Sequence, residues 1–167
     1  MMGQHRVLAH IVGHCLEVAK VALFLAAELN KRGQRIDLRL VEAASLLHDL
    51  TKTEGLRTRE DHAKTGSQLL KGMGYERVGE VVLQHIHLSE KIDPSHVSEE
   101  EVVNYADKRV RHDRVVSLRE RFLDLKERYG KSQRSFEPLD DLEKATFELE
   151  KKIFSILEIN PGDLHSL

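Results

Sequence analysis

The sequence predicts an all-α protein built as a bundle of about seven helices. Two observations carry this prediction. Apolar residues recur at spacings of three and four along most of the chain, whereas no convincing run alternates with a period of two. Helix-capping and helix-stop residues separate the apolar stretches from one another. A chain of 167 residues is long enough to bury one sizeable core, so we expect about one domain.

The first half of the chain contains four expected helices. Gly33 is placed to end the first of them, which carries a long apolar stripe. Asp37 is a good N-cap for the second, and Glu54-Gly55 begins the loop after it. Met73-Gly74 stops the third helix. These helices are expected at residues 5–32, 37–52, 59–72 and 76–88.

The second half begins with an irregular stretch, residues 89–97, that we expect to line or cover a site. Ser98 and Glu101 then form a capping-box pattern, which starts a fifth helix. A polar linker is expected at 131–137, and Pro138 suits the first turn of the last helix. The helices in this half are expected at residues 99–107, 113–129 and 138–160. We therefore divide the chain into a domain at 1–130 and a C-terminal linker and helix, 131–167, packed on it.

The last helix carries an apolar stripe whose partner the sequence leaves open. The stripe consists of Leu142, Ala145, Leu149 and Ile153. Docking on the chain's own core is the favoured interpretation, and association of two copies as a homodimer is the alternative.

The composition of the chain argues against two kinds of binding partner, nucleic acids and membranes. The net charge is −2 with 32% charged residues, so the chain lacks the basic field that dominates nucleic-acid binding. The longest purely apolar run, residues 21–27, is far shorter than the roughly 20 residues that cross a bilayer. The single cysteine, Cys15, fits a reducing compartment. No secretory signal is visible. We expect a cytoplasmic protein that binds neither nucleic acid nor membrane.

Histidine and aspartate residues suggest a metal centre assembled from three helices. His14 lies within the apolar stripe of the first helix, His48-Asp49 follow two leucines, and Asp107 ends the fifth helix. Imidazole and carboxylate suit iron, manganese, cobalt, nickel or zinc. Neighbouring residues on a helix diverge by about 100°, so His48 and Asp49 can approach one site together. The alternatives are a hydrogen-bonded core histidine for His14 and plain ion pairs for the two aspartates.

The order His, His-Asp, Asp resembles the HD domain superfamily of metal-dependent phosphohydrolases. The resemblance covers roughly residues 5–115 and implies an all-helical fold and a metal-dependent phosphohydrolase activity. The segment His-Asp-Leu-Thr-Lys at 48–52 is similar to the family's His-Asp-Ile-Gly-Lys variant, with Leu-Thr in place of Ile-Gly. Tyr-Ala-Asp-Lys at 105–108 is similar to the last motif of that branch.

Residues 48–108 are also similar to the branch that hydrolyses diadenosine tetraphosphate, in which extra histidines bind a second ion. His62 and His85 match those histidines by segment, which implies two metal ions. If they are instead solvated or outer histidines, one ion remains. His87 is a poor substitute for His85, because two residues along a helix turn the side chain by about 200°. His10 is interpreted as a surface histidine.

The resemblance also implies catalytic roles. Asp49 would bridge two ions that clamp the attacking and leaving oxygens. Lys52 lies one helical turn after His48 and could hold a substrate phosphate, although a helix-terminal lysine is the simpler explanation. Lys108, Arg109 and Arg111 could bind further phosphates, or form a solvated charged face.

The leading hypothesis is therefore a metal-dependent phosphohydrolase acting on a nucleotide or a related phosphate ester or anhydride. A dinucleoside polyphosphate is the favoured substrate on resemblance alone. The second enzymatic candidate is a mononuclear 5′-nucleotidase, whose family members tend to carry glutamate where this chain has Lys52. The alternative from another class is a catalytically silent nucleotide sensor or regulatory module.

Overall fold

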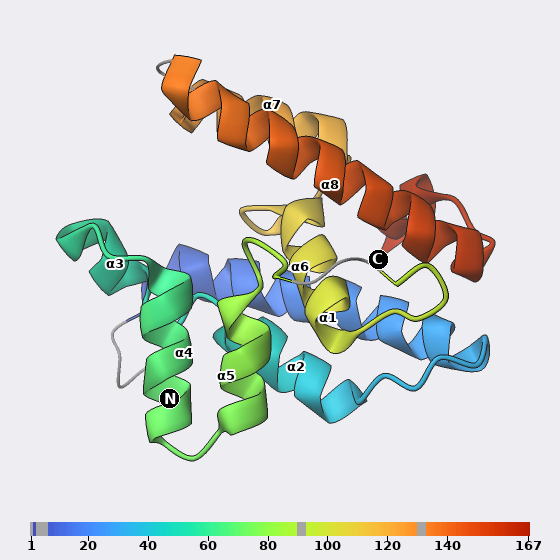
Figure 1. Cartoon of the computed structure of the whole chain (residues 1–167), viewed down its shortest axis with the longest axis horizontal. Coiled ribbons are helices and arrows are strands. Elements are labelled where there is room, and N and C mark those ends of the chain that lie inside the picture. Colours follow the sequence, from blue (N-terminus) through green and yellow to red (C-terminus); the bar gives the residue numbers. More distant parts are fainter. Residues whose placement is uncertain (1, 3–6, 90–92, 130–132) are drawn as a thin grey trace.

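The computed structural model describes residues 2, 7–89, 93–129 and 133–167, with the side chains of 133–137 left out. This part of the chain forms eight α-helices, one short hairpin and a final 3₁₀ turn, so the predicted all-α class is confirmed (Figure 1). The elements in order are α1 Ala9–Lys31, α2 Leu38–Leu47, α3 Lys52–Thr58, α4 His62–Gly72, α5 Glu76–Leu83, α6 Glu99–Arg109, β1 Val110–Arg111, β2 Arg114–Val115, α7 Leu118–Tyr129, α8 Gln133–Leu157 and η1 Pro161–Ser166.

Helix α1 is the centre of the bundle and packs against α2, α6 and α8. Val18, Ala22, Leu25 and Leu29 repeat at helical spacing and are fully buried, as the sequence pattern predicts. Within the described residues, α1 is the one helix long and apolar enough to cross a membrane, but half of its most apolar 18-residue window is buried inside the molecule. Its packing is that of a core helix.

The remaining helices form two pairs around α1 and α6. Helices α4 and α5 pack antiparallel at one end of the molecule, and α7 and α8 form a second antiparallel pair along one side (Figure 1). The α6 N-terminus has the predicted capping box between Ser98 and Glu101, and Asp37 caps α2 through the backbone N–H groups of Arg39 and Leu40. These caps fix where the helices begin.

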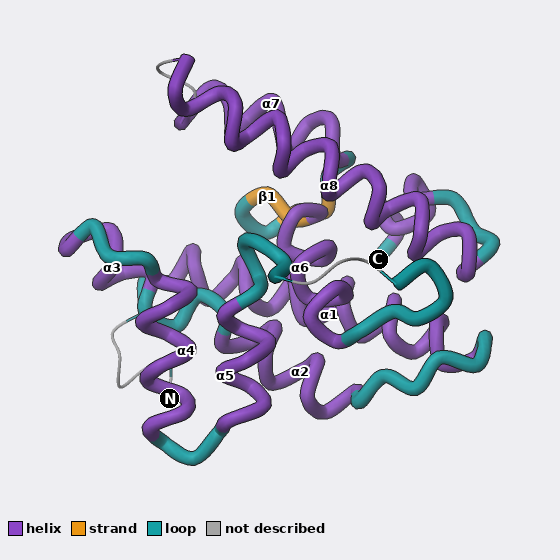
Figure 2. Tube along the Cα trace, viewed as in Figure 1, coloured by secondary structure: helices purple, strands orange, loops and turns teal. Residues whose placement is uncertain are grey.

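Several boundaries differ from the sequence-based expectation. Residues 52–58, expected to be largely loop, form α3, in which Glu54 and Arg57 pair one turn apart. Helix α5 ends at Leu83 rather than near residue 88. A two-stranded hairpin, β1–β2, separates α6 from α7 (Figure 2). Two-residue strands are too short to produce an alternating apolar pattern, which explains why the sequence did not reveal them.

The predicted linker at 131–137 is wrong for residues 133–137, which already belong to α8, with Pro138 inside the helix. Pro138 is the sixth residue of α8, so the N–H that it lacks leaves a carbonyl group of the first turn without its helical partner. Helix α8 docks on the chain's own core through Leu149, Ile153 and Leu157, as favoured. Ala145, however, is exposed, and the buried position beside it is Thr146.

Two buried ion pairs attach α8 to α6. The Lys152 ammonium donates to both carboxylate oxygens of Glu101, at 2.7 and 2.6 Å. The Arg109 guanidinium lies 3.4 Å from a Glu150 oxygen and donates to the Tyr105 hydroxyl at 2.6 Å. A buried charge is stable only when paired, so these contacts tie the position of α8 to that of α6.

Replacing Lys152 with Met should lower the free energy of unfolding by about 3 kcal/mol, because it leaves the Glu101 carboxylate buried without its counter-charge. The matched control is Lys151→Met, whose lysine pairs with Glu148 on the exposed face of the same helix. The control should change the stability by about 0.5 kcal/mol or less. Urea unfolding followed by circular dichroism measures both; equal effects of the two variants would contradict this account.

Candidate metal centre

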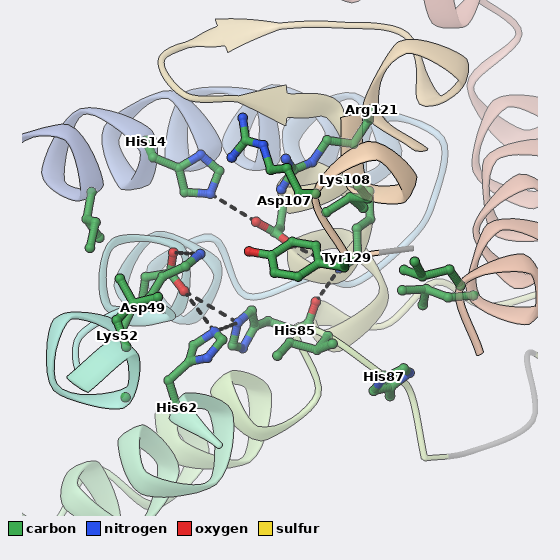
Figure 3. A pocket seen from close by; sticks show the side chains of 18 of the residues that line it. His14, Asp49, Lys52, His62, His85, His87, Asp107, Lys108, Arg121 and Tyr129 are labelled. Atoms are coloured by element: carbon green, nitrogen blue, oxygen red, sulfur yellow. Dashed lines mark hydrogen bonds and ion pairs between the residues drawn. The ribbon is translucent and has the colours of Figure 1, made fainter. Parts of the chain in front are cut away.

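The first group of candidate ligands gathers where α1, α6 and the end of α2 meet (Figure 3). His14 Nε2 lies 3.0 Å from Asp107 Oδ1. His48 Nε2 lies 3.5 Å from the same oxygen and 3.6 Å from Asp49 Oδ2. Three helices that are distant in sequence thus bring their polar atoms to one point, as the sequence predicts for this set.

The second group shares Asp49 with the first. Asp49 Oδ1 lies 3.2 Å from His62 Nε2 and 3.7 Å from His85 Nε2, and the two histidine nitrogens are 3.3 Å apart. In the sets His14, His48, Asp49 and Asp49, His62, His85, the candidate ligand atoms all lie within 4.8 Å of one another. All six predicted side chains are therefore brought together, with one carboxylate common to both groups.

Backbone carbonyls orient three of the rings. The Nδ1 atoms of His14, His48 and His85 lie 3.0, 2.7 and 2.7 Å from carbonyl oxygens of His112, Ser45 and Val82, respectively. A carbonyl oxygen can only accept, so each Nδ1 carries a proton and each Nε2 faces the centre, where it can bind a metal ion once it is deprotonated. This is the tautomer that metal-binding histidines use, with the second nitrogen hydrogen-bonded to an outer group.

Two buried polar atoms in the centre have no hydrogen-bond partner among the described residues: His48 Nε2 and Asp49 Oδ1. Leaving such an atom unpaired inside a protein costs about 1–3 kcal/mol. His14 Nε2 and Asp107 Oδ1 face each other at 3.0 Å, where either a proton or a metal ion can join them. A cation satisfies all of these atoms, so the donor set fits a divalent transition metal.

The electrostatics of the centre also favour a cation. Burial lowers the pKa of His48, but the charge of Asp49 and a hydrogen bond with Asp107 outweigh it and raise that pKa well above its ordinary value. Burial raises the pKa of Asp49, yet the charge of His48, the hydrogen bonds with His62 and His85 and the charge of Lys52 together hold that pKa well below normal. For His85 burial dominates and lowers the pKa to about 4. The carboxylates are thus ionised and His85 is neutral at neutral pH, as ligands must be, whereas His48 would have to release its Nε2 proton to a bound metal ion.

Lys52 and Lys108 both face the metal centre, but they differ in how far their side chains are exposed. Lys52 Nζ lies 2.6 Å from Asp49 Oδ2 and remains partly exposed. The Lys108 side chain is buried, and its ammonium donates to the His85 carbonyl at 2.7 Å and to Asp107 Oδ2 at 3.0 Å. Lys108 therefore orients two candidate ligands in addition to lining the cavity above them.

Arg109 and Arg111 lie outside that cavity, contrary to the expectation that they bind substrate phosphates. The Arg109 side chain is buried and donates to the carbonyls of Val116 and Pro161, at 2.7 and 2.9 Å. Arg111 is exposed on β1. Arg109 faces Glu150 of α8, whereas the turn of the hairpin keeps His112, but not Arg111, at the site.

The cavity above the centre has a volume of about 650 Å³. Its lining includes residues that the sequence analysis did not assign to the site, from α7 and from the first part of α8: Arg121, Leu125, Arg128, Tyr129, Pro138, Leu139 and Leu142. Arg121 extends into the cavity, and its buried Nε has no hydrogen-bond partner among the described residues (Figure 3). Arg121, Leu125 and Arg128 follow one another at helical spacing, so the sequence indicated that they share one face of a helix. It did not indicate which part of the protein that face lies against.

Two further expectations about the cavity need revision. His87 lines it, although a continuous helix would have turned His87 away; α5 ends at Leu83, so helical geometry no longer applies there. His10 also lines the cavity while remaining exposed. Of the 89–97 loop, residues 90–92 lie outside the described residues, and none of the others lines the cavity.

Thr51, within the segment that links the two ligand groups, positions His62. Its hydroxyl donates to the His62 carbonyl at 2.9 Å and lies 2.9 Å from the Thr65 hydroxyl. A Cβ atom on Gly66 would lie only 3.3 Å from the Thr51 oxygen, so the first turn of α4 packs closely on this side chain. Asp61 caps the same turn through the N–H groups that follow His62.

Comparison with known proteins agrees with this geometry. The sequence profile of the HD domain matches residues 11–129, so the chain belongs to the HD domain family. The chain is also 31% identical over 80 residues to an uncharacterized protein of Methanocaldococcus jannaschii. That similarity covers 46% of this chain and 45% of the relative, less than half of its length. No solved structure matches the chain.

The Thr51→Val variant should weaken metal binding at the His62 group roughly tenfold, the scale observed when outer groups of a metal site are removed. Valine keeps the shape of threonine but cannot hold the His62 carbonyl. Thr51→Ser keeps the hydroxyl and should bind like the original protein. Titration with Co²⁺ measures the affinities; an unchanged affinity in the valine variant, or an equal loss in both variants, would contradict the role given to the hydroxyl.

Proposed function

We propose that this protein is a metal-dependent phosphohydrolase that holds two divalent ions and acts on a nucleotide or a related phosphate ester or anhydride. The observation that carries the proposal is the shared carboxylate of Asp49, with two groups of nitrogen and oxygen donors on either side of it at the floor of a cavity. Membership of the HD domain family supports the reaction class.

The donors divide naturally between two ions. His14, His48, Asp49 and Asp107 would hold the first ion, and Asp49, His62 and His85 would hold the second. Divalent ions of this kind polarise a phosphoryl oxygen and make water nucleophilic near neutral pH. The similarity of residues 48–108 to the diadenosine tetraphosphate branch favours a dinucleoside polyphosphate as substrate.

The chain's own cations would complete the site. The Lys52 ammonium is held beside Asp49 and is partly exposed to the cavity, so it can approach an anionic substrate without leaving its place. Arg121 offers a planar guanidinium, which matches two oxygens of a phosphate group at once. Fixed positive groups of this kind stabilise the charge that develops during phosphoryl transfer.

Purified without added metal or chelating affinity resin, the protein should contain about two metal equivalents. The His62→Ala and His85→Ala variants should each reduce this number toward one, because both histidines belong to the same ligand group. His96→Ala is the control, since this histidine is exposed and outside the cavity. Elemental analysis gives the count. One equivalent, unaffected by either variant, would favour a mononuclear enzyme acting on monophosphates.

Turnover should stop when the metal is removed by a chelator and return when Mn²⁺ or Co²⁺ is added back. In the reloaded protein, Lys52→Met should lower kcat/KM about 100-fold, the usual cost of losing one fixed charge-stabilising group. Lys64→Met, an exposed change on α4, should have little effect. Phosphate and nucleotide release from a panel that includes diadenosine tetraphosphate measures activity. Tight nucleotide binding without turnover by the metal-loaded protein would instead establish the sensor alternative.

A further inference from the structure

The cavity is divided into a polar floor and an apolar outer wall. The floor consists of the candidate metal ligands with Lys52 and Lys108. The outer wall is built from the α7–α8 pair, with Leu125, Tyr129 and Leu139 among its members. A substrate that only needed its phosphate bound would use the floor alone.

Packing against the core accounts for Leu125 and Leu142 of the outer wall, but not for the rest of the apolar lining of the cavity. Tyr129 is 57% exposed although its ring lines the cavity, and Leu56, which also lines the cavity from α3, is 65% exposed. Large apolar side chains that remain accessible in a cavity commonly provide its binding surface. The wall also extends past the HD domain match, which ends at residue 129, since Pro138 and Leu139 belong to α8.

Helix α7 connects the floor to the wall. Arg121, Leu125 and Tyr129 follow one another at intervals of four residues, so they lie along one face of the helix. Arg121, in the first turn of the helix, lies close enough to the floor for its charge to act on Lys52 and Lys108, and Tyr129 is the last residue of the helix. A ligand lying along this face meets a guanidinium first and an aromatic ring last, which suits an anion joined to an apolar group.

We propose that the wall formed by Leu125, Tyr129, Pro138, Leu139 and Leu142 binds the base of a nucleotide whose phosphates reach the metal centre. This inference rests on the proposed function and narrows it: substrates without a base, such as inorganic polyphosphates, are poor ones. Stacking on one aromatic side chain strengthens binding by about tenfold or more per base.

The wall favours a flat group with polar edges over an alkyl chain. Tyr129 and Pro138 present flat rings, against which a base can stack. The same cavity also includes Arg59, Glu60 and His87, all exposed, which can exchange hydrogen bonds with the edges of a base. An alkyl chain would desolvate such groups without replacing their hydrogen bonds.

The test compares two ligands that cannot be hydrolysed: methylenediphosphonate and the α,β-methylene analogue of adenosine diphosphate. Isothermal titration of the metal-loaded protein should show the nucleotide analogue binding at least tenfold more tightly. Tyr129→Ala should remove most of this difference, and Tyr129→Phe should retain it. Tyr75→Ala, at an exposed tyrosine outside the cavity, is the control and should change neither affinity.

The outcomes separate the two levels of the proposal. Equal affinity for both ligands, unchanged in Tyr129→Ala, would overturn the base site and leave the phosphohydrolase proposal standing. Binding of neither ligand by protein with its full metal content would overturn the proposed function, and the base site with it. If octylphosphonate binds as tightly as the nucleotide analogue and also loses affinity in Tyr129→Ala, the wall binds alkyl groups and the base assignment is wrong.

Discussion

The buried carboxylate of Asp49 is the constraint on which the site depends. Its side chain is 1% exposed, and it has an imidazole or ammonium nitrogen on several sides. An ionised carboxylate in this position requires positive charge around it, because the cost of removing it from water would otherwise be several kcal/mol. Lys52 supplies part of that charge. The unpaired Oδ1, facing His62 and His85, is where a bound cation would supply the rest.

Three of the candidate ligands, His48, Asp49 and His85, are positioned by the end of a helix rather than by the face of one. His48 and Asp49 follow the last residue of α2, and His85 comes just after α5. The last carbonyls of a helix lack the N–H partner four residues on, and two of them, in Ser45 and Val82, accept the ring N–H of the histidine three residues later; the Val82 carbonyl also accepts the backbone N–H of His85. One local arrangement, used twice, satisfies a helix terminus and fixes an imidazole with its free nitrogen toward the centre.

The sequence predicted those features of the site and fold that a few neighbouring residues encode. The motif residues, the Ser98 capping box and the core stripe of α1 are encoded over a few neighbouring residues each. Placing His48 and Asp49 on one helix was wrong, although both residues do reach the centre. The sequence could not predict the different places of Arg109 and Arg121, because both are arginines on amphipathic helices. Tertiary packing decides that Arg109 contacts α8 and that Arg121 lines the cavity.

The attachment of α8 to α6 connects the outer wall of the cavity to the helix that carries Asp107. Asp107 lies on α6, between Glu101 and Arg109, whose side chains pair with Lys152 and Glu150 of α8. Helix α6 therefore carries a candidate ligand on one side and anchors the outer wall of the cavity on the other. Buried ion pairs are often no more stabilising than apolar contacts, but they fix which residues face each other. We infer that these pairs set the position of the α8 wall relative to Asp107. The family's core would then supply the chemistry together with Tyr129, and the C-terminal helix would complete the wall that receives the group attached to the phosphate.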